Sequence, residues 1–149
     1  MLLTGTFTRS IDEKLRLAIP KRLLKAAFTT PGGATLFAAP GTDGSLGLYT
    51  EDAFAQLAAR LAQASPTGRD VRAFSRMFYG QAQALEVDAQ GRVRIPPELA
   101  KLAGLGKEAV LVGVQDHLEL WDRQRWETYL TEKQAHYDEI AEAALHPKS

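Results

Sequence analysis

The sequence contains no cysteine among its 149 residues, which excludes a disulfide framework, a thiolate nucleophile and a zinc site built on cysteine. It also has no apolar run near the roughly 20 residues that span a bilayer. The opening segment, residues 1–5, lacks the basic start and the apolar stretch of a signal peptide. Because 45% of the residues are hydrophobic, the chain can form a core. We therefore expect a folded cytoplasmic protein with no membrane partner.

Motifs for catalysis and metal binding are missing as well. The three histidines, His117, His136 and His146, do not have the spacing of metal ligands. A glycine-rich phosphate loop and a nucleophile elbow are also absent. The sequence therefore predicts a protein that is not an enzyme and that has no metal site, no cofactor and no small-molecule substrate.

The formal net charge is zero, but the two signs of charge occupy different segments. Residues 9–25 hold six basic and two acidic side chains, and residues 69–107 hold seven basic and four acidic ones. Residues 108–149 hold nine acidic and four basic side chains instead. Two basic segments can offer phosphate-binding faces even in a neutral protein, although such segments are commonly just solvated surface.

An internal repeat organises the chain. Residues 11–20, Ile-Asp-Glu-Lys-Leu-Arg-Leu-Ala-Ile-Pro, align with residues 87–96, Val-Asp-Ala-Gln-Gly-Arg-Val-Arg-Ile-Pro, at a shift of 76. Residues 46–49 align with residues 118–121 at a shift of 72, so the first copy has four more residues in the loop around 40–44. Several matches in the same order indicate a duplicated unit.

Each copy predicts the same order of elements: a strand, a tight turn, a second strand, a helix and two more strands. The predicted strands lie at 5–11, 17–19, 35–38 and 46–49 in the first copy, and at 82–87, 93–95, 109–113 and 117–121 in the second. A proline follows the second strand and begins a helix, at 20–28 or at 96–103. A unit of about 45 residues is too small to bury its apolar faces alone. The sequence therefore predicts a β-rich α+β fold in which the two copies pack together.

Helical segments separate and follow the two copies. Apolar residues recur at helical spacing in 54–61 and in 71–78, and Thr67 with Asp70 resembles a capping box. A longer helix is expected from about Asp122. Its apolar side carries Trp126, Leu130, Tyr137, Ile140 and Ala144. This side packs inward or contacts a neighbouring subunit. The expected segments are a first unit at 1–50, connecting helices at 51–80, a second unit at 81–122 and a C-terminal helix at 123–149.

Two Asp-x-x-x-Arg motifs and their surroundings resemble the MraZ family of bacterial regulators. The motifs are Asp-Glu-Lys-Leu-Arg at 12–16 and Asp-Ala-Gln-Gly-Arg at 88–92. The second half is the closer match. Its matching segments are Ser-Arg-Met-Phe-Tyr-Gly-Gln-Ala at 75–82, Gly-Arg-Val-Arg-Ile-Pro-Pro-Glu-Leu at 91–99 and Leu-Glu-Leu-Trp-Asp at 118–122. The resemblance covers the chain from residue 1 to about residue 130.

The resemblance implies two tandem AbrB-like (SpoVT-AbrB) swapped-hairpin units in a pseudo-symmetric double unit with flanking helices. It also implies a homo-oligomeric ring that binds double-stranded promoter DNA, at short GTG-rich direct repeats upstream of the division and cell-wall gene cluster. It further implies repression of that cluster and association with the nucleoid. Two alternatives stay open, which are an AbrB-like antitoxin and a structural ring with little affinity for DNA.

The motif arginines are the main candidates for DNA contact. Arg16 and Arg92 are expected to read guanine, because a guanidinium can donate two hydrogen bonds to guanine O6 and N7. Asp12 and Asp88 are expected to scaffold the turns. The full set of expected DNA-contacting residues is Arg16, Arg92, Lys14, Arg94, Lys21 and Arg22, of which the last two would hold phosphates. Alternatively, each Asp–Arg pair only stabilises its own hairpin.

The first motif departs from the family at one position. The family commonly has glycine directly before the motif arginine, and this chain has Leu15 there. Because glycine allows a positive φ that leucine disfavours, the first turn could be reshaped or could present Arg16 differently. Leu15 could instead add an apolar contact at the DNA-binding or subunit surface.

Overall fold

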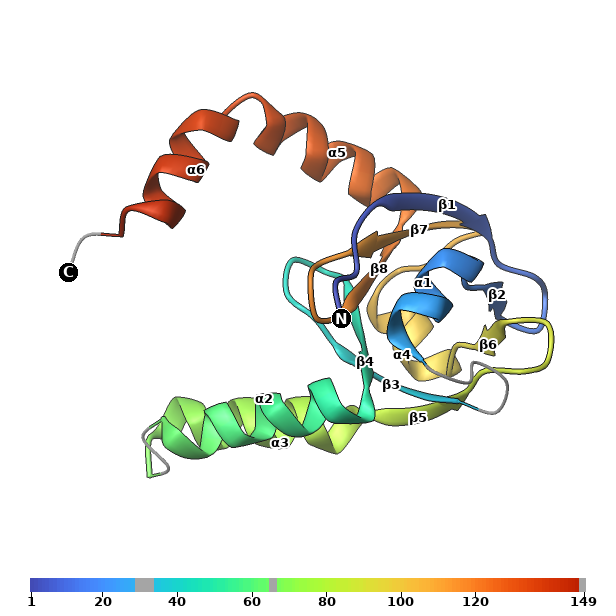
Figure 1. Cartoon of the computed structure of the whole chain (residues 1–149), viewed down its shortest axis with the longest axis horizontal. Helices are drawn as coiled ribbons and strands as arrows, with labels where there is room; N and C mark the ends of the chain where they lie inside the picture. Colours follow the sequence, from blue (N-terminus) through green and yellow to red (C-terminus); the bar gives the residue numbers. More distant parts are fainter. Residues whose placement is uncertain (29–33, 65–66, 148–149) are drawn as a thin grey trace.

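A six-stranded antiparallel sheet and a separate two-stranded ribbon form the centre of the molecule (Figure 1). The computed structural model describes residues 1–28, 34–64 and 67–147. The first repeat comprises β1 (Thr6–Ser10), β2 (Arg16–Ala18), α1 (Lys21–Ala27), β3 (Thr35–Pro40), β4 (Leu46–Thr50) and α2 (Glu51–Gln63). Helix α3 (Arg69–Gln81) leads into the second repeat, which comprises β5 (Gln83–Glu86), β6 (Arg92–Arg94), α4 (Pro97–Leu102), β7 (Glu108–Gly113), β8 (Leu118–Asp122), α5 (Arg123–Gln134) and α6 (Tyr137–Leu145). The predicted order of strands and helices and the α+β class are confirmed.

The two repeats exchange strands within one sheet, whose order is β1-β7-β8-β4-β3-β5. Strand β1 of the first repeat pairs with β7 of the second, and β5 of the second repeat pairs with β3 of the first. Strands at equivalent repeat positions also pair with each other, β4 with β8 in the middle of the sheet and β2 with β6 in the separate ribbon. In the ribbon, Leu17 lies opposite Val93, its counterpart at the shift of 76. The duplication in sequence therefore appears as an approximate twofold symmetry in space.

A single apolar core draws its residues from both repeats. Leu17 and Val93 point inward from the ribbon and are fully buried, whereas the residues on either side of each are more exposed, as expected from the alternation of side chains along a strand. Leu48 and Leu120 contribute from the sheet. Burying one such leucine stabilises the fold by about 1.5–3 kcal/mol. Because both repeats contribute residues to this cluster, neither repeat has a core of its own.

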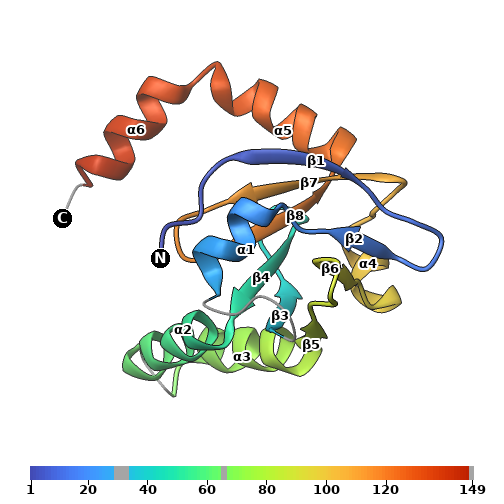
Figure 2. The same cartoon turned by 45° about the vertical axis from the view of Figure 1, so that its right-hand side comes forward.

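Helices α2, α3 and α5 cover the face of the sheet that points away from the apolar core (Figures 1 and 2). Helices α2 and α3 lie antiparallel and pack against β3 and β4, whereas α5 packs against β7 and β8 before α6 extends away from the body. Thr50 and Asp122 are equivalent at the shift of 72, and each accepts a hydrogen bond from the third backbone N–H of its helix, at 3.2 Å and 3.3 Å respectively. In the described ranges, no helix is long and apolar enough to cross a membrane.

Two local predictions were wrong. Helix α3 begins after Gly68 and no side chain caps it, so Thr67 and Asp70 do not form a capping box; the preceding Ser65 and Pro66 lie outside the described residues. The single C-terminal helix is two helices. The N–H of His136 donates to the carbonyl of Lys133 at 3.0 Å, and this tighter turn ends α5 before α6 begins.

Candidate nucleic-acid interface

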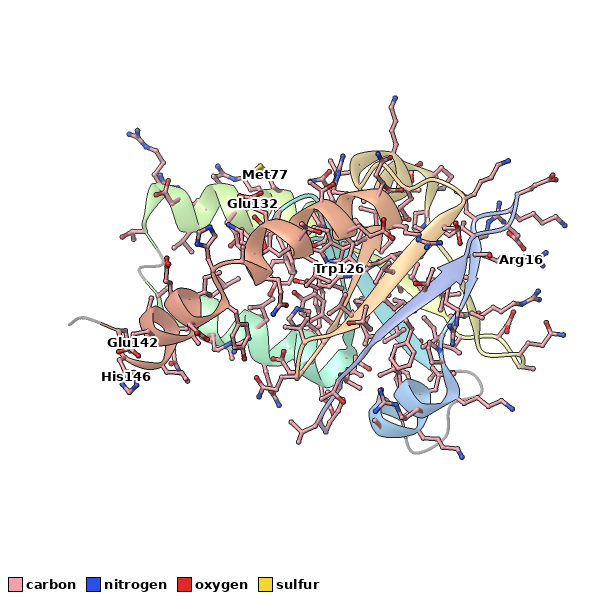
Figure 3. The ribbon with its side chains drawn as sticks, turned by 90° about the horizontal axis from the view of Figure 1, so that it is seen from above. Arg16, Met77, Trp126, Glu132, Glu142 and His146 are labelled. Carbon is pink, nitrogen blue, oxygen red and sulfur yellow. The ribbon has the colours of Figure 1, made fainter. Side chains whose placement is uncertain are left out.

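The two Asp-x-x-x-Arg turns lie at the same end of the molecule, beside the β2–β6 ribbon and away from α2, α3 and α6 (Figure 1). Figure 3 shows Arg16 at this end and His146 at the opposite end. The fold therefore brings together the two motifs that are 76 positions apart in the sequence.

The first turn is held by the carboxylate of Asp12. Its Oδ1 accepts hydrogen bonds from the backbone N–H groups of Lys14 at 2.9 Å and Arg16 at 2.8 Å. Its Oδ2 accepts from Nε of Arg16 at 2.8 Å. The turn closes through the N–H of Leu15, which donates to the carbonyl of Asp12 at 3.0 Å. One carboxylate thus fixes both the turn and the base of the guanidinium.

The second turn repeats this arrangement bond for bond. Asp88 accepts from the N–H groups of Gln90 and Arg92, both at 2.9 Å, and from Nε of Arg92 at 3.1 Å. The N–H of Gly91 donates to the carbonyl of Asp88 at 3.0 Å. Each aspartate therefore makes the same three hydrogen bonds within its own turn.

Leu15 does not reshape the first turn. It adopts φ 62° where Gly91 has φ 78°, so leucine occupies the left-handed conformation that glycine adopts at lower cost. Its side chain is half-buried and packs against the apolar core. Hydrogen bonds across the ribbon are also equivalent, because Leu15 accepts from the N–H of Ile95 at 2.8 Å and Gly91 accepts from the N–H of Ile19 at 2.9 Å.

The side chains of both motif arginines are partly exposed to solvent. The side chain of Arg16 is 35% exposed and that of Arg92 is 34% exposed. Within the described part of the chain, each makes its only side-chain hydrogen bond through Nε. The Asp–Arg pair therefore anchors the base of each guanidinium and leaves its outer nitrogens for another acceptor.

The ribbon places the remaining basic residues unevenly. Arg94 lies directly opposite Arg16, whereas Ala18 lies opposite Arg92. Side chains directly opposite each other in antiparallel strands are about 4.5–5.5 Å apart at Cβ, and like charges in such pairs are destabilising. An anion that binds across Arg16 and Arg94 would relieve this repulsion.

The nominated residues of the turn and of α1 differ in their availability. Lys14 is exposed in the first turn, and Lys21 lies with Lys25 along a groove that runs beside residues 88–91. Lys25 was not among the predicted site residues. It follows Lys21 by four residues, and this spacing could have predicted that the two lysines share one helix face. Arg22 is engaged within the chain, because it donates to the carbonyl of Thr4 at 2.9 Å and lies 5.1 Å from the ring centre of Phe7.

The pKa values of the two motif aspartates are lowered by hydrogen bonds within their turns. The backbone N–H of Arg16, followed by its side chain, holds the pKa of Asp12 below its ordinary value. The N–H of Arg92 does the same for the pKa of Asp88. Both carboxylates therefore remain charged, and remain hydrogen-bond acceptors, under more acidic conditions than a free aspartate.

No group of histidine and acidic side chains that could hold a metal ion is present in residues 1–28, 34–64 and 67–147. His117 instead lies 2.7 Å from Asp116, through Nδ1 and Oδ1, and its ring stacks on Tyr49 at 4.8 Å between ring centres. Burial raises the pKa of Tyr49 to about 12. This cluster lies between the β7–β8 turn and β4, so it joins the two repeats.

Comparisons with known proteins agree with the resemblance in the two motifs. A family profile described as "MraZ protein, putative antitoxin-like" matches residues 78–147. Transcriptional regulator MraZ of Lactobacillus delbrueckii subsp. bulgaricus is 39% identical over 138 residues, which cover 93% of each chain. The proteins of the same name from Thermomicrobium roseum and Limosilactobacillus reuteri are 43% identical over 122 residues and 41% identical over 141 residues. These matches cover 82% of both chains in the first case, and 95% of this chain and 96% of the relative in the second.

Proposed function

Because the chain belongs to the MraZ family, we propose that it is a transcriptional regulator that binds promoter DNA as a homo-oligomeric ring. Its targets are short direct repeats upstream of the division and cell-wall gene cluster, which it represses at the nucleoid. The observation that carries this proposal is the pair of guanidiniums at one end of the molecule. Each is held at Nε by an aspartate, and each arginine side chain is about one-third exposed.

The exchanged strands support two AbrB-like swapped-hairpin units, at 1–50 and 81–122, joined by the connecting helices at 51–80 and followed by the helical segment at 123–149. In this proposal the paired ribbon, rather than a helix, approaches DNA. A two-stranded antiparallel ribbon fits the major groove, which is about 12 Å wide. Arg16 and Arg92 would then lie at its two ends, because they sit diagonally across the β2–β6 pairing.

The basic residues have different roles in this proposal. Arg16 and Arg92 read base edges, since a fixed guanidinium can donate two parallel hydrogen bonds to guanine. Lys14, Lys21 and Arg94 are exposed and bind phosphates, which positions the protein without reading sequence. Arg22 has the weakest case among the nominated residues, because Thr4 and Phe7 already engage its guanidinium.

A ring compensates for the modest charge of each chain. Neighbouring copies can engage neighbouring repeats, and the second contact benefits from a high effective concentration. An antitoxin of this kind would use a flexible tail to wrap a toxin. Residues 123–145 consist almost entirely of α5 and α6 instead. Regulation through multivalent DNA binding therefore fits the arrangement better than toxin capture does.

The proposal is tested by titrating the protein against DNA with one promoter repeat and with tandem repeats. We expect tandem repeats to bind about 10²–10⁴-fold more tightly, and binding to fall steeply as salt increases. A shuffled sequence of the same length measures non-specific binding. Equal affinity for one repeat and for the array would exclude the multivalent mechanism, and equal affinity for the shuffled DNA would exclude sequence-specific reading.

A further inference from the structure

Helix α6 exposes the apolar side of an amphipathic helix. Its apolar residues recur at spacings of three and four, so they share one face. They are Tyr137, Ile140, Ala141, Ala144 and Leu145. None is buried, and Tyr137 and Leu145 are 63% and 74% exposed. A helix of nine residues is shorter than the about 12–15 residues that even good helix formers need in water. Helix α6 therefore needs a packing partner.

The anchoring of α5 fixes where α6 is presented. Trp121 of β8 packs against Trp126 and Tyr129 of α5, with ring centres 5.3 Å and 4.9 Å apart. Arg125 also donates to the carbonyl of Gly44 at 3.1 Å. The first turns of α5 are thus fixed to the sheet, while α6 extends from the body (Figures 1 and 2). The apolar face of α6 is therefore presented to solvent at a fixed position relative to the sheet.

Helix α3 offers a surface that complements α6 in charge and in shape. Helix α6 has three acidic residues and no basic one, whereas α3 has three arginines and one aspartate. On α3, Phe74 and Met77 are exposed although they are large and apolar, and Figure 3 shows Met77 projecting from the edge of the molecule. Arg72 precedes Phe74, and Arg76 lies between Phe74 and Met77 in the sequence.

Gly80 of α3 is a second indication that another helix packs on this helix. A Cβ placed on Gly80 would meet no atom within 4 Å, so packing within the chain gives no reason for glycine there. Glycine inside a helix costs about 1 kcal/mol relative to alanine, and it allows another backbone to approach closely. Together with Ala73 and Met77, it leaves a shallow apolar strip on which a second helix can lie.

We propose that α6 of one copy packs on α3 of a second copy, so that the copies join head to tail. This contact deepens the homo-oligomer of the proposed function and rests on it. The alternative symmetric contact, α6 against α6, would bring three acidic residues against three acidic residues and is disfavoured by repulsion. A contact between two different surfaces closes into a ring when its rotation permits. Both helices lie away from the β2–β6 ribbon, so the contact leaves every Arg16 and Arg92 accessible.

The apolar part of the contact is tested with Ile140→Asp and Leu145→Asp in the full chain. We expect each to raise the concentration at which the oligomer dissociates at least about tenfold, because a carboxylate would be buried in an apolar contact. Light scattering after size exclusion measures the mass, and circular dichroism checks that the single chain stays folded. Ala143→Asp adds the same charge to the same helix off the apolar face and should leave the mass unchanged.

The charged part is tested by reversal in two variants. One variant combines Arg72→Glu and Arg76→Glu, and the other combines Glu139→Lys and Glu142→Lys. Each should be a single chain by itself, whereas a mixture should assemble with alternating copies, because every α6–α3 contact then joins opposite charges. Failure to assemble after mixing would overturn the pairing of these two helices.

The mass readout separates this inference from the proposed function, because it does not depend on DNA. A wild-type protein that is a single chain would contradict the oligomer itself. If the oligomer persists in all four variants, only the α6–α3 contact is overturned. A contact between α6 and α3 of the same chain would overturn it as well. If the mass changes as expected but the wild-type oligomer binds promoter DNA no better than shuffled DNA, the DNA-binding proposal is overturned and this contact stands.

Discussion

The two Asp-x-x-x-Arg turns share every backbone hydrogen bond but differ in the side chains that surround them. The first turn carries Glu-Lys-Leu at 13–15, and the second carries Ala-Gln-Gly at 89–91. Across the ribbon, Arg16 has a second arginine opposite it, whereas Arg92 has an alanine. In contrast, only the second turn borders the groove lined by Lys21 and Lys25. The conserved geometry comes from residues that the repeats have in common, and the electrostatic difference comes from residues that they do not.

This comparison suggests that the two ends of the ribbon bind DNA unequally. A symmetric ribbon would present the same surface to either direction along the duplex. Here one end presents two adjacent guanidiniums, and the other presents one guanidinium beside a groove with two lysines. A ribbon of this kind suits repeats that all run in the same direction.

The largest effect is expected from Arg16→Ala and Arg92→Ala. Each should cost about 1–3 kcal/mol of binding to the promoter repeats, a roughly 5- to 150-fold rise in Kd, because a base-reading fork is lost. Gel-shift titration measures the change. Arg60→Ala on α2 removes the same charge far from the ribbon and should bind like the wild type. A variant of Arg16 or Arg92 with wild-type affinity would remove that residue from the set that reads bases.

The inequality of the two ends is tested by Ala18→Arg. This substitution places an arginine opposite Arg92 and copies the Arg16–Arg94 arrangement at the other end. We expect tighter binding to all DNA and a slope of binding against salt that is steeper by about 1, as for one added phosphate contact. Ala18→Gln matches the length without the charge and should not change the slope. An unchanged slope for Ala18→Arg would mean that this end does not face phosphate.

The cost of leucine in the first turn is tested by comparing Leu15→Gly with Leu15→Ala. Both substitutions remove the packing of Leu15 on the core, but only glycine releases the strain of the positive φ. We therefore expect the glycine variant to be the more stable by about 1 kcal/mol, which is the reverse of the usual order in regular structure. Urea unfolding measures the difference. If alanine were the more stable residue, the first turn would not hold the conformation of the second.

The smallest effect is expected for the pH dependence of the turns, since Asp12 and Asp88 are near the surface. Because their pKa values are lowered in the folded protein, they stabilise it above the ordinary aspartate pKa of about 3.9, and this stabilisation is lost as the pH falls below that value. Asp12→Asn and Asp88→Asn should therefore be less stable than the wild type at neutral pH, and the difference should shrink in acid. Glu13→Gln controls for removing one negative charge from the same turn. A difference that is independent of pH would assign the loss to geometry instead of charge.

Much of the fold could be predicted from the repeat. The elements and their order follow from alternating apolar residues, from prolines after the short strands and from Gly104, which adopts φ 62° after α4. The two errors, at Thr67 with Asp70 and at the junction of α5 and α6, both concern helix ends. Such ends depend on one or two hydrogen bonds, which packing and local backbone geometry can override.

The site could be predicted only in part. Repetition singled out Arg16, Arg92 and their aspartates, because the motif recurs in the same context. Sequence reasoning did not predict that the carbonyl of Thr4 accepts a hydrogen bond from Arg22, or that the helix face of Lys21 and Lys25 lines a groove beside the turn of the other repeat. These are contacts between segments remote in sequence, and no local pattern encodes them.

The duplication, the class of each element and the two motifs can be read from the sequence, because they depend on the local spacing of apolar residues, prolines and charged groups. Three other features depend on contacts between remote segments: the repeats exchange strands, Leu15 takes the conformation of glycine, and Arg94 faces Arg16 while Ala18 faces Arg92. Burial explains this dependence. Neither repeat can cover its own apolar surface, so the register in which they pair is set by the core they build together, and that register fixes which charges meet at the surface.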